Sequence, residues 1–218
     1  MKPYYQDESV TLYHGRCEDV LPQLEFDAIV SDPPYGMDYK HGTRKGGVRL
    51  GHDGESIDGD DEPFDPSHLL ARKVPTILWG GNHYADSLPP SRGWLVWDKR
   101  DGRPSNDQSD AELAWTNILT TARVHSRYWS GNVRTGREQA EGRMHVNQKP
   151  VALMVWCLQF LPSLDVVVID PYAGSGSTLV AARDLGMPHA IGIEYKEAHC
   201  EAIAKRLAQG VLDFGDAS

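Results

Sequence analysis

The sequence predicts one α/β domain built on a doubly wound, mostly parallel β-sheet. Short apolar runs such as Ala28–Val30 and Val166–Ile169 are typical of parallel strands that are buried on both faces. These runs alternate with segments of helical periodicity, which is the pattern of a parallel sheet covered by helices. At 218 residues the chain is long enough for one full hydrophobic core and short for two.

The first half of the chain is expected to combine strands with one helix and a long loop. The helix spans Glu18–Leu24, since apolar residues recur there at helical spacing. Gly36–Pro66 is rich in Gly, Asp and basic residues and lacks apolar periodicity, so we expect a loop, with a variable part over 36–74. Strands are expected over Val10–Tyr13, Ala28–Val30, Thr76–Trp79 and Trp94–Trp97.

The second half contains the clearest strand and helix patterns. Ala111–Trp115 and Val124–Trp129 alternate between apolar and polar residues, which suits antiparallel strands near a sheet edge. Pro150 precedes an apolar helix, at a position natural for a first helical turn. The remaining expected elements are the helices Val151–Leu161, Ser177–Leu185 and Glu197–Leu207 and the strands Val166–Ile169 and Ala190–Ile193.

Composition excludes several classes of protein. No run of about 18 apolar residues is present, and Met1–Glu8 lacks the apolar core of a secretory signal. Cys17, Cys157 and Cys200 lie far apart without a Cys-x-x-Cys pair, so neither a disulfide framework nor a zinc site is expected. We therefore expect a reduced, cytoplasmic protein without a metal centre.

The distribution of charge leaves nucleic-acid binding open. The net charge of −9 argues against it, because phosphates attract Lys and Arg. Acidic residues gather over Asp53–Asp65, however, whereas nine basic and six acidic residues lie between Lys99 and Lys149. A local basic surface is compatible with DNA, although such a scatter of charges equally suits ordinary solvated surface.

A glycine-rich turn and an acidic residue predict a nucleoside-cofactor site. The turn follows the strand at Val166–Ile169 and reads Asp170-Pro171-Tyr172-Ala173-Gly174-Ser175-Gly176-Ser177-Thr178. Its glycines let a ligand approach the backbone, and the helix N-terminus beyond suits a carboxylate or phosphate. Glu194 closes the next strand, where an acid can accept hydrogen bonds from ribose hydroxyls. The spacing differs from GxGxxG, which disfavours NAD.

A second motif, Asp32-Pro33-Pro34-Tyr35, ends the strand at Ala28–Val30. A turn can use these prolines for conformational reasons alone. The motif also suggests a more specific, catalytic role. An exocyclic amine on a nucleobase is a poor nucleophile, because its lone pair is delocalised into the ring. The Asp32 carboxylate and the Pro33 carbonyl could accept the two N–H groups and free that lone pair, while Tyr35 offers a stacking face to an extruded base.

The two motifs resemble those of the DNA amino-methyltransferases, which read DPPY and DPFxGSG. Their order, with the catalytic motif first, resembles the circularly permuted β-group of bacterial and phage enzymes. His145–Pro150 resembles the family's HPTQKP, and Gly15–Leu21 resembles its GDCLEVL. Trp94–Lys99 and Asp110–Trp115 are also similar to members of this group. The resemblance implies a Rossmann-like methyltransferase fold, S-adenosylmethionine as cofactor and DNA as substrate.

The resemblance also implies residue roles. Asp32 and Pro33 would orient and polarise the target amine, Tyr35 would stack on the base, and Pro34 belongs to the same catalytic motif. Glu194 would bind the ribose hydroxyls. Asn147 and Lys149 would contact the carboxylate end of the cofactor. The other implied cofactor residues are Cys17, Asp19, Asp170, Tyr172, Ala173, Gly174, Ser175, Gly176, Ser177 and Thr178.

Two positions depart from the family pattern. Tyr172 stands where Phe is usual, a change that keeps a ring near the sulfonium. Arg16 stands where the family usually has an Asp that contacts the cofactor adenine. Either Asp19 or a backbone group takes that contact, or adenine is recognised differently.

The family places DNA recognition in variable parts between the motifs. The candidates here are Gly36–Pro66, Lys99–Asp110 and Gly131–His145. Basic residues in these loops could touch DNA or could equally be solvated charges. Those taken as DNA-binding candidates are Arg44, Lys45, Arg49, Arg134 and Arg137. Because members of this group often dimerise, a homodimer is left open.

Adenine N6 is the favoured target, because Asp32 occupies a position where cytosine-N4 enzymes more usually have Ser. Methylation of cytosine N4 is the first alternative. An RNA or protein methyltransferase is disfavoured by the motif order. A regulatory module that binds the cofactor without activity is disfavoured by the intact Asp32-to-Tyr35 motif.

Overall fold

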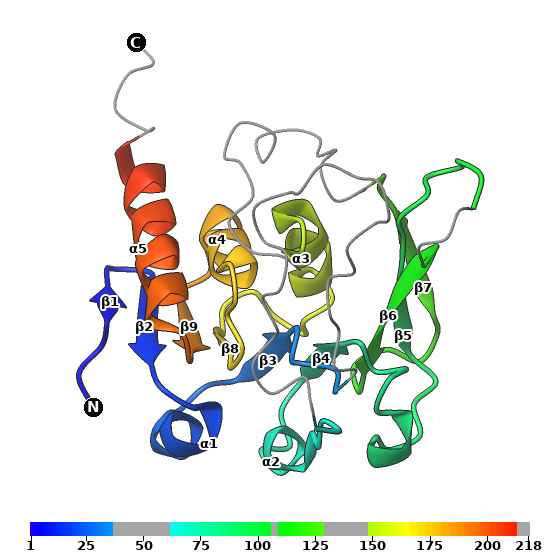
Figure 1. Cartoon of the computed structure of the whole chain (residues 1–218), viewed down its shortest axis with the longest axis horizontal. Coiled ribbons are helices and arrows are strands. Elements are labelled where there is room, and N and C mark those ends of the chain that lie inside the picture. The colour runs from blue at the N-terminus through cyan, green and yellow to red at the C-terminus, as the bar shows by residue number, and fades with distance from the viewer. Residues whose placement is uncertain (37–61, 106–108, 129–147, 213–218) are drawn as a thin grey trace, which may run out of the picture.

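The computed structural model describes residues 1–36, 62–105, 109–128 and 148–212, which form a nine-stranded sheet flanked by helices (Figure 1). The strands are β1 (Tyr5–Gln6), β2 (Val10–His14), β3 (Ala28–Ser31), β4 (Thr76–Trp79), β5 (Trp94–Asp98), β6 (Ala111–Thr116), β7 (Arg123–Ser126), β8 (Val167–Asp170) and β9 (His189–Glu194). The helices are α1 (Cys17–Val20), α2 (Ser67–Leu70), α3 (Val151–Leu158), α4 (Ser177–Asp184) and α5 (Glu197–Leu212), with 3₁₀ turns at Leu21–Gln23 and Ala85–Ser87.

The sheet is mostly parallel, as the sequence predicts. Its strand order is β1-β2-β9-β8-β3-β4-β6-β5-β7. The strands β2, β9, β8, β3 and β4 run parallel to one another. β1 is antiparallel to β2, and β6 is antiparallel to both β4 and β5. The late strands β8 and β9 are thus inserted between β2 and β3, which come early in the chain.

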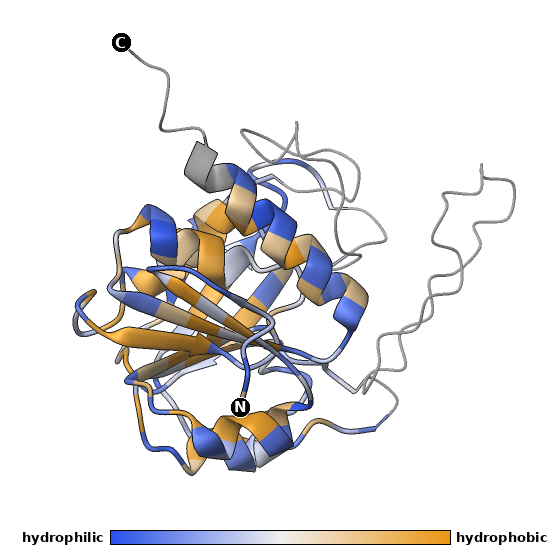
Figure 2. Ribbon diagram, turned by 90° about the vertical axis from the view of Figure 1, so that its left-hand side faces the viewer, coloured by the Kyte–Doolittle hydropathy of each residue, from blue (hydrophilic) through white to orange (hydrophobic). Residues whose placement is uncertain are grey.

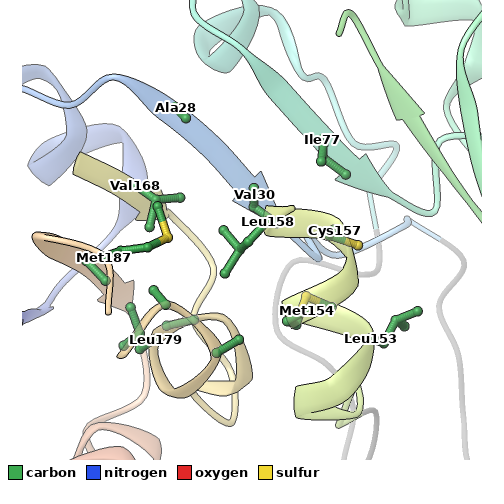
Figure 3. Close-up of a cluster of buried hydrophobic side chains, with 14 of the residues drawn as sticks. Ala28, Val30, Ile77, Leu153, Met154, Cys157, Leu158, Val168, Leu179 and Met187 are labelled. Atoms are coloured by element: carbon green, nitrogen blue, oxygen red, sulfur yellow. The ribbon is translucent and has the colours of Figure 1, made fainter. Parts of the chain in front are cut away.

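Helices cover both faces of the sheet. The helices α3, α4 and α5 lie on one face, and α1 and α2 lie on the other (Figure 1). Alternate residues of each strand serve the two layers: Val30 belongs to the core below α3 and α4, whereas Ile29 packs toward α1 and α2. Figure 3 shows Leu158 and Leu179 of the first layer close to Val30 and Val168 of the strands. The continuous apolar runs in the sequence follow from burial on both sides.

The hydropathy of the layers fits this arrangement. Figure 2 shows hydrophobic strands in the middle, with helices of mixed hydropathy on either side. Helix α5 has exposed residues such as Glu201 and Lys205 and buries Cys200, Ile203 and Leu207. This is the amphipathic pattern of a helix that packs one face on a sheet.

Two helical segments differ from the sequence-based expectation. The helix expected over Glu18–Leu24 breaks after Val20 into a 3₁₀ turn, because Pro22 lacks the N–H needed to continue the α-helix. The loop expected over 36–74 contains α2 and the buried Leu69, so this prediction was wrong for residues 67–70. One helical turn is too short to show a periodicity and is stabilised here by tertiary packing.

The orientation predicted for the strand at Val124–Trp129 was wrong. Strand β7 ends at Ser126 and runs parallel to β5. Both edges of β6 are already paired, with β4 and β5, so the chain that leaves β6 crosses β5 and pairs with its far edge. Because β6 is antiparallel to β5, a strand that returns in the direction opposite to β6 runs parallel to β5.

Within the described ranges, no helix combines the length and apolar character that crossing a bilayer requires. The same ranges hold no group of three or more His, Cys, Asp or Glu side chains arranged to bind a metal ion.

Candidate active site

The two sequence motifs meet at one edge of the sheet. Strands β3 and β8 pair in parallel, with Ala28 opposite Val168, so Asp32 and Asp170 leave neighbouring strands at their carboxyl ends. The Ser31 hydroxyl donates a 2.7 Å hydrogen bond to Asp170 Oδ1 and ties the two strand ends together. This edge is also where ligands bind in open α/β sheets.

The glycine-rich turn after β8 leaves space beside its backbone. Gly174 and Gly176 have φ angles of +55° and +74°, a region that side chains disfavour. A Cβ at Gly176 would meet Ile203 at 3.0 Å. A Cβ at Gly174 would meet only Tyr172 O, at 3.9 Å, and would otherwise project into open space. The turn can therefore accept a ligand close to Gly174.

Asp170 holds the start of this turn. Its Oδ1 accepts the Ser31 hydroxyl and the Tyr172 N–H, the latter at 3.2 Å. Burial raises the pKa of its carboxyl to about 6, although hydrogen bonds from Thr178 and Ser31 oppose the rise. The side chain thus shapes the loop, and its predicted contact with a cofactor stays a prediction.

Glu194 faces the same turn from the end of β9. Its Oε2 accepts the Gly174 N–H at 2.8 Å, and its Oε1 accepts the Lys196 N–H at 2.9 Å. Burial acts to raise the pKa of this carboxyl, but His199 and the backbone donors outweigh it, so the pKa is lowered. A buried carboxylate therefore stands beside the open position at Gly174.

The residues at α1 form the rim of this region. Cys17 Sγ lies 3.6 Å from His68 Nε2, which lies 3.1 Å from the Tyr172 hydroxyl. Burial raises the pKa of the Cys17 thiol to about 12, so it stays protonated. Asp19 is exposed on α1. Arg16 turns outward, 3.7 Å from Glu18 and over the exposed ring of Tyr195.

Asp32 lies at the centre of a hydrogen-bonded cluster. Its Oδ1 accepts the Tyr35 hydroxyl at 2.6 Å, and its Oδ2 accepts Lys149 Nζ at 2.6 Å. Lys149 Nζ also donates to the Tyr35 hydroxyl at 3.0 Å. Burial raises the pKa of the Asp32 carboxyl against the opposing charge of Lys149. Burial also holds the pKa of Tyr35 well above its usual value, so the phenol remains a donor.

Glu112 completes this cluster from β6, and sequence reasoning missed it. Its Oε2 lies 3.0 Å from Lys149 Nζ, within ion-pair distance but without hydrogen-bond alignment. Its Oε1 accepts Lys99 Nζ at 2.9 Å. Burial would raise its pKa, but the two lysines lower it to about 2. The signal available in the sequence was a lone acid within an alternating, half-buried strand.

The Lys149 ammonium pairs with carboxylates near the catalytic motif, and its predicted contact with the cofactor stays a prediction. The ammonium is buried and meets Asp32 and Glu112. A buried ammonium requires counter-ions, and these two carboxylates supply them. Its backbone carbonyl accepts the Ser177 hydroxyl at 2.7 Å, which joins this residue to the cofactor turn. Asn147, which was predicted to contact the cofactor together with Lys149, lies outside the described residues. So do the DNA-binding candidates Arg44, Lys45, Arg49, Arg134 and Arg137.

Tyr35 packs in a position that only glycine allows. Gly80, at the end of β4, has a φ of +73°, and a Cβ there would lie 2.0 Å from Tyr35 Cε1. His83 stacks on the Tyr35 ring with centroids 5.0 Å apart and planes 12° from parallel. His83 therefore covers one face of the Tyr35 ring at stacking distance.

Gly80→Ala is expected to displace Tyr35 and to lower stability by about 2 kcal/mol or more, from backbone strain and the clash. The melting temperature and the enzymatic activity should both fall. Gly186→Ala is the matched control, because Gly186 has a φ of +67° but no atom within 4 Å of a built Cβ. It should lower only the melting temperature, and an equal loss of activity in both variants would contradict the packing role of Gly80.

Comparison with known proteins agrees with this geometry. Residues 84–206 match the N6/N4 methyltransferase family model, described as a DNA methylase. The type II methyltransferase M.HinfI of Haemophilus influenzae is 34% identical, over 96% of this chain and 71% of that protein. The type II methyltransferase M.ScaI of Streptomyces caespitosus is 26% identical, over 94% of this chain and 84% of that protein.

Solved structures share the fold. The PvuII DNA methyltransferase, described as cytosine-N4-specific, superposes with a TM-score of 0.61 at 13% identity, covering 97% of this chain and 93% of its own. The M1.HpyAVI–SAM complex gives a TM-score of 0.55 at 19% identity, covering 90% and 99%. The chain belongs to the N6/N4 DNA methyltransferase family, whose members use S-adenosylmethionine to methylate an exocyclic amino group in DNA.

Proposed function

We propose that this enzyme methylates adenine N6 in DNA. The observation that carries the proposal is the Asp32 carboxylate at the edge of the sheet, directly beside the strand that leads into the cofactor turn. An aspartate at the first motif position favours adenine over cytosine N4, where Ser is more usual. Methylation of cytosine N4 would use the same chemistry and is the alternative outcome of the test.

The cofactor turn fits S-adenosylmethionine. The open position at Gly174 leaves room for the ligand, and Glu194 offers a carboxylate to the ribose hydroxyls. Helix α4 begins at Ser177, directly after this turn, and the first N–H groups of a helix suit an anionic group. Tyr172 would keep its ring near the sulfonium. We assign Ala173, Ser175, Gly176 and Thr178 to this site as parts of the same turn.

The chemistry follows from the acceptors around the amine. Asp32 would accept one N–H of the target amine and the Pro33 carbonyl the other, which draws the lone pair out of the ring. Bound S-adenosylmethionine supplies an electrophilic methyl group, which bonds to the amine nitrogen as its bond to sulfur breaks. Asp32 is then placed to take the proton that the nitrogen must lose. Positioning and polarisation supply the catalysis, without a covalent enzyme intermediate.

DNA would be held by basic residues of the variable segments between the motifs. Arg44, Lys45, Arg49, Arg134 and Arg137 remain our candidates for phosphate or base contacts. Tyr35 would stack on the extruded base, and Pro34 would keep the turn rigid.

The test is incubation of the purified chain with unmethylated DNA and S-adenosylmethionine, followed by nucleoside mass spectrometry. Formation of N6-methyladenine supports the proposal. Formation of N4-methylcytosine keeps the mechanism and overturns the choice of base. A product found only on RNA or protein, or tight cofactor binding without any product, overturns the DNA assignment.

A further inference from the structure

Four charged side chains form a continuous chain from the β5–β6 hairpin to the catalytic motif. Lys99 pairs with Glu112, Glu112 approaches Lys149, and Lys149 pairs with Asp32. The four formal charges cancel in pairs. Asp32 follows β3, Glu112 lies in β6 and Lys149 precedes α3, so tertiary structure alone brings them together.

In this structure the Lys149 ammonium forms its hydrogen bonds with residues of the catalytic motif. The bonds to Asp32 Oδ2 and to the Tyr35 hydroxyl are short, at 2.6 and 3.0 Å. These bonds engage Asp32, the carboxylate that the target amine needs. An N–H group of the target amine must compete with the Lys149 ammonium for the Asp32 carboxylate. The ammonium can give up this carboxylate only if a second buried acceptor is within reach.

Glu112 provides that second acceptor. Its Oε2 is buried and 3.0 Å from Lys149 Nζ, and no donor among the described residues is aligned on it. Lys99 holds the other oxygen, so Oε2 is kept facing Lys149. A small rotation of the ammonium would exchange its hydrogen bond from Asp32 to Glu112 without a return to solvent.

We propose that Glu112 is a positioning residue that receives Lys149 when the target amine binds Asp32. The inference rests on the proposed function. In the free enzyme Lys149 compensates Asp32, and with substrate bound it is held by Glu112, which leaves Asp32 to the amine. Glu112 acts through Lys149 and touches neither the base nor the cofactor.

Titratable groups among the described residues face Asp32 and determine the direction of the expected pH effect. These are Lys149, Glu112, Tyr35, Tyr84 and Asp170. The negative charge of Glu112 adds to the burial that raises the pKa of Asp32, and Lys149 lowers it. Removing Glu112 should therefore lower the pKa of Asp32, and removing Lys149 should raise it. Since the carboxylate is the active form, the acid limb of the rate profile should shift the same way.

Glu112→Gln tests the proposal, because the amide keeps the size of the side chain but cannot compensate an ammonium. We expect kcat to fall by about 10- to 100-fold, with unchanged affinity for S-adenosylmethionine. The acid limb should move to lower pH despite the lower rate. Glu201→Gln is the matched control, because Glu201 pairs with Lys205 on the exposed face of α5, and its rate should be unchanged.

A double-variant cycle tests the route through Lys149. In a Lys149→Met background, Glu112→Gln should add no further loss of kcat. Additive losses would overturn the proposal, as would a Glu112→Gln enzyme with wild-type kcat and pH profile.

A second readout does not depend on turnover. Titration of ¹³C-labelled aspartate carboxyls by NMR, with Asp32 assigned from Asp32→Asn, should show a lower Asp32 pKa in Glu112→Gln. If the wild-type chain methylates no DNA, the proposed function fails, and this titration still decides whether Glu112 acts on the Asp32 site. An unchanged Asp32 titration overturns the inference.

Discussion

Asp32→Asn is expected to lower the rate of DNA methylation by about 10³-fold at saturating cofactor. The variant keeps the size of the side chain but loses the charge that polarises the amine. It also turns one acceptor into an NH₂ group, which would face the Tyr35 hydroxyl or the Lys149 ammonium. Binding of S-adenosylmethionine should be retained, because Asp32 stands beyond the cofactor turn. Single-turnover methylation and calorimetry of cofactor binding measure the two effects separately.

The matched control is Asp27→Asn at the start of the same strand region. Asp27 is exposed, and its carboxylate accepts the Val167 N–H at 2.8 Å, which an amide oxygen can also do. Its activity should equal that of the wild type. A near-normal rate in Asp32→Asn would show that the amine is activated without this carboxylate.

Glu194→Gln is expected to weaken S-adenosylmethionine binding by about 30- to 100-fold. The carboxylate accepts the N–H groups of Gly174 and Lys196 and would accept the ribose hydroxyls as well. An amide has one oxygen for these donors, so the turn and the ribose would compete for it. The dissociation constant should rise, while kcat at saturating cofactor should change much less.

Glu197→Gln provides the comparison for that variant. Glu197 is exposed at the start of α5, three residues further along the chain, and the change removes the same charge. Its cofactor affinity should equal that of the wild type. Equal weakening in both variants would mean that general electrostatics, rather than a ribose contact, explains the effect.

The central strands and both motifs could be predicted from the sequence because their signals are local. Ala28–Val30 and Val166–Ile169 are continuous apolar runs, which are typical of strands buried on both faces of a sheet. The proline motif and the glycine motif begin where these runs end. The pairing of β3 with β8 was not predicted, because no local pattern determines which strands become neighbours.

The features that were missed depend on contacts between distant segments. Glu112 gains its role only because β6 passes beside β4 and faces Lys149. The direction of β7 depends on which sheet edge remains free, and no local pattern encodes this. Likewise α2 is a single helical turn that is stabilised by the burial of Leu69. A segment this short shows no hydrophobic periodicity in the sequence.

The insertion of β8 and β9 between β2 and β3 has a consequence for how the chain folds. During synthesis, β2 and β3 emerge long before the two strands that separate them in the finished sheet. Strands β2 and β3 can pair with β9 and β8 only after residues 167–194 have been synthesised. These contacts are distant in sequence, and contacts of that kind form slowly. The polypeptide that carries Asp32 therefore leaves the ribosome without a cofactor turn beside it. The active site is therefore complete only after β8 and β9 have inserted into the sheet.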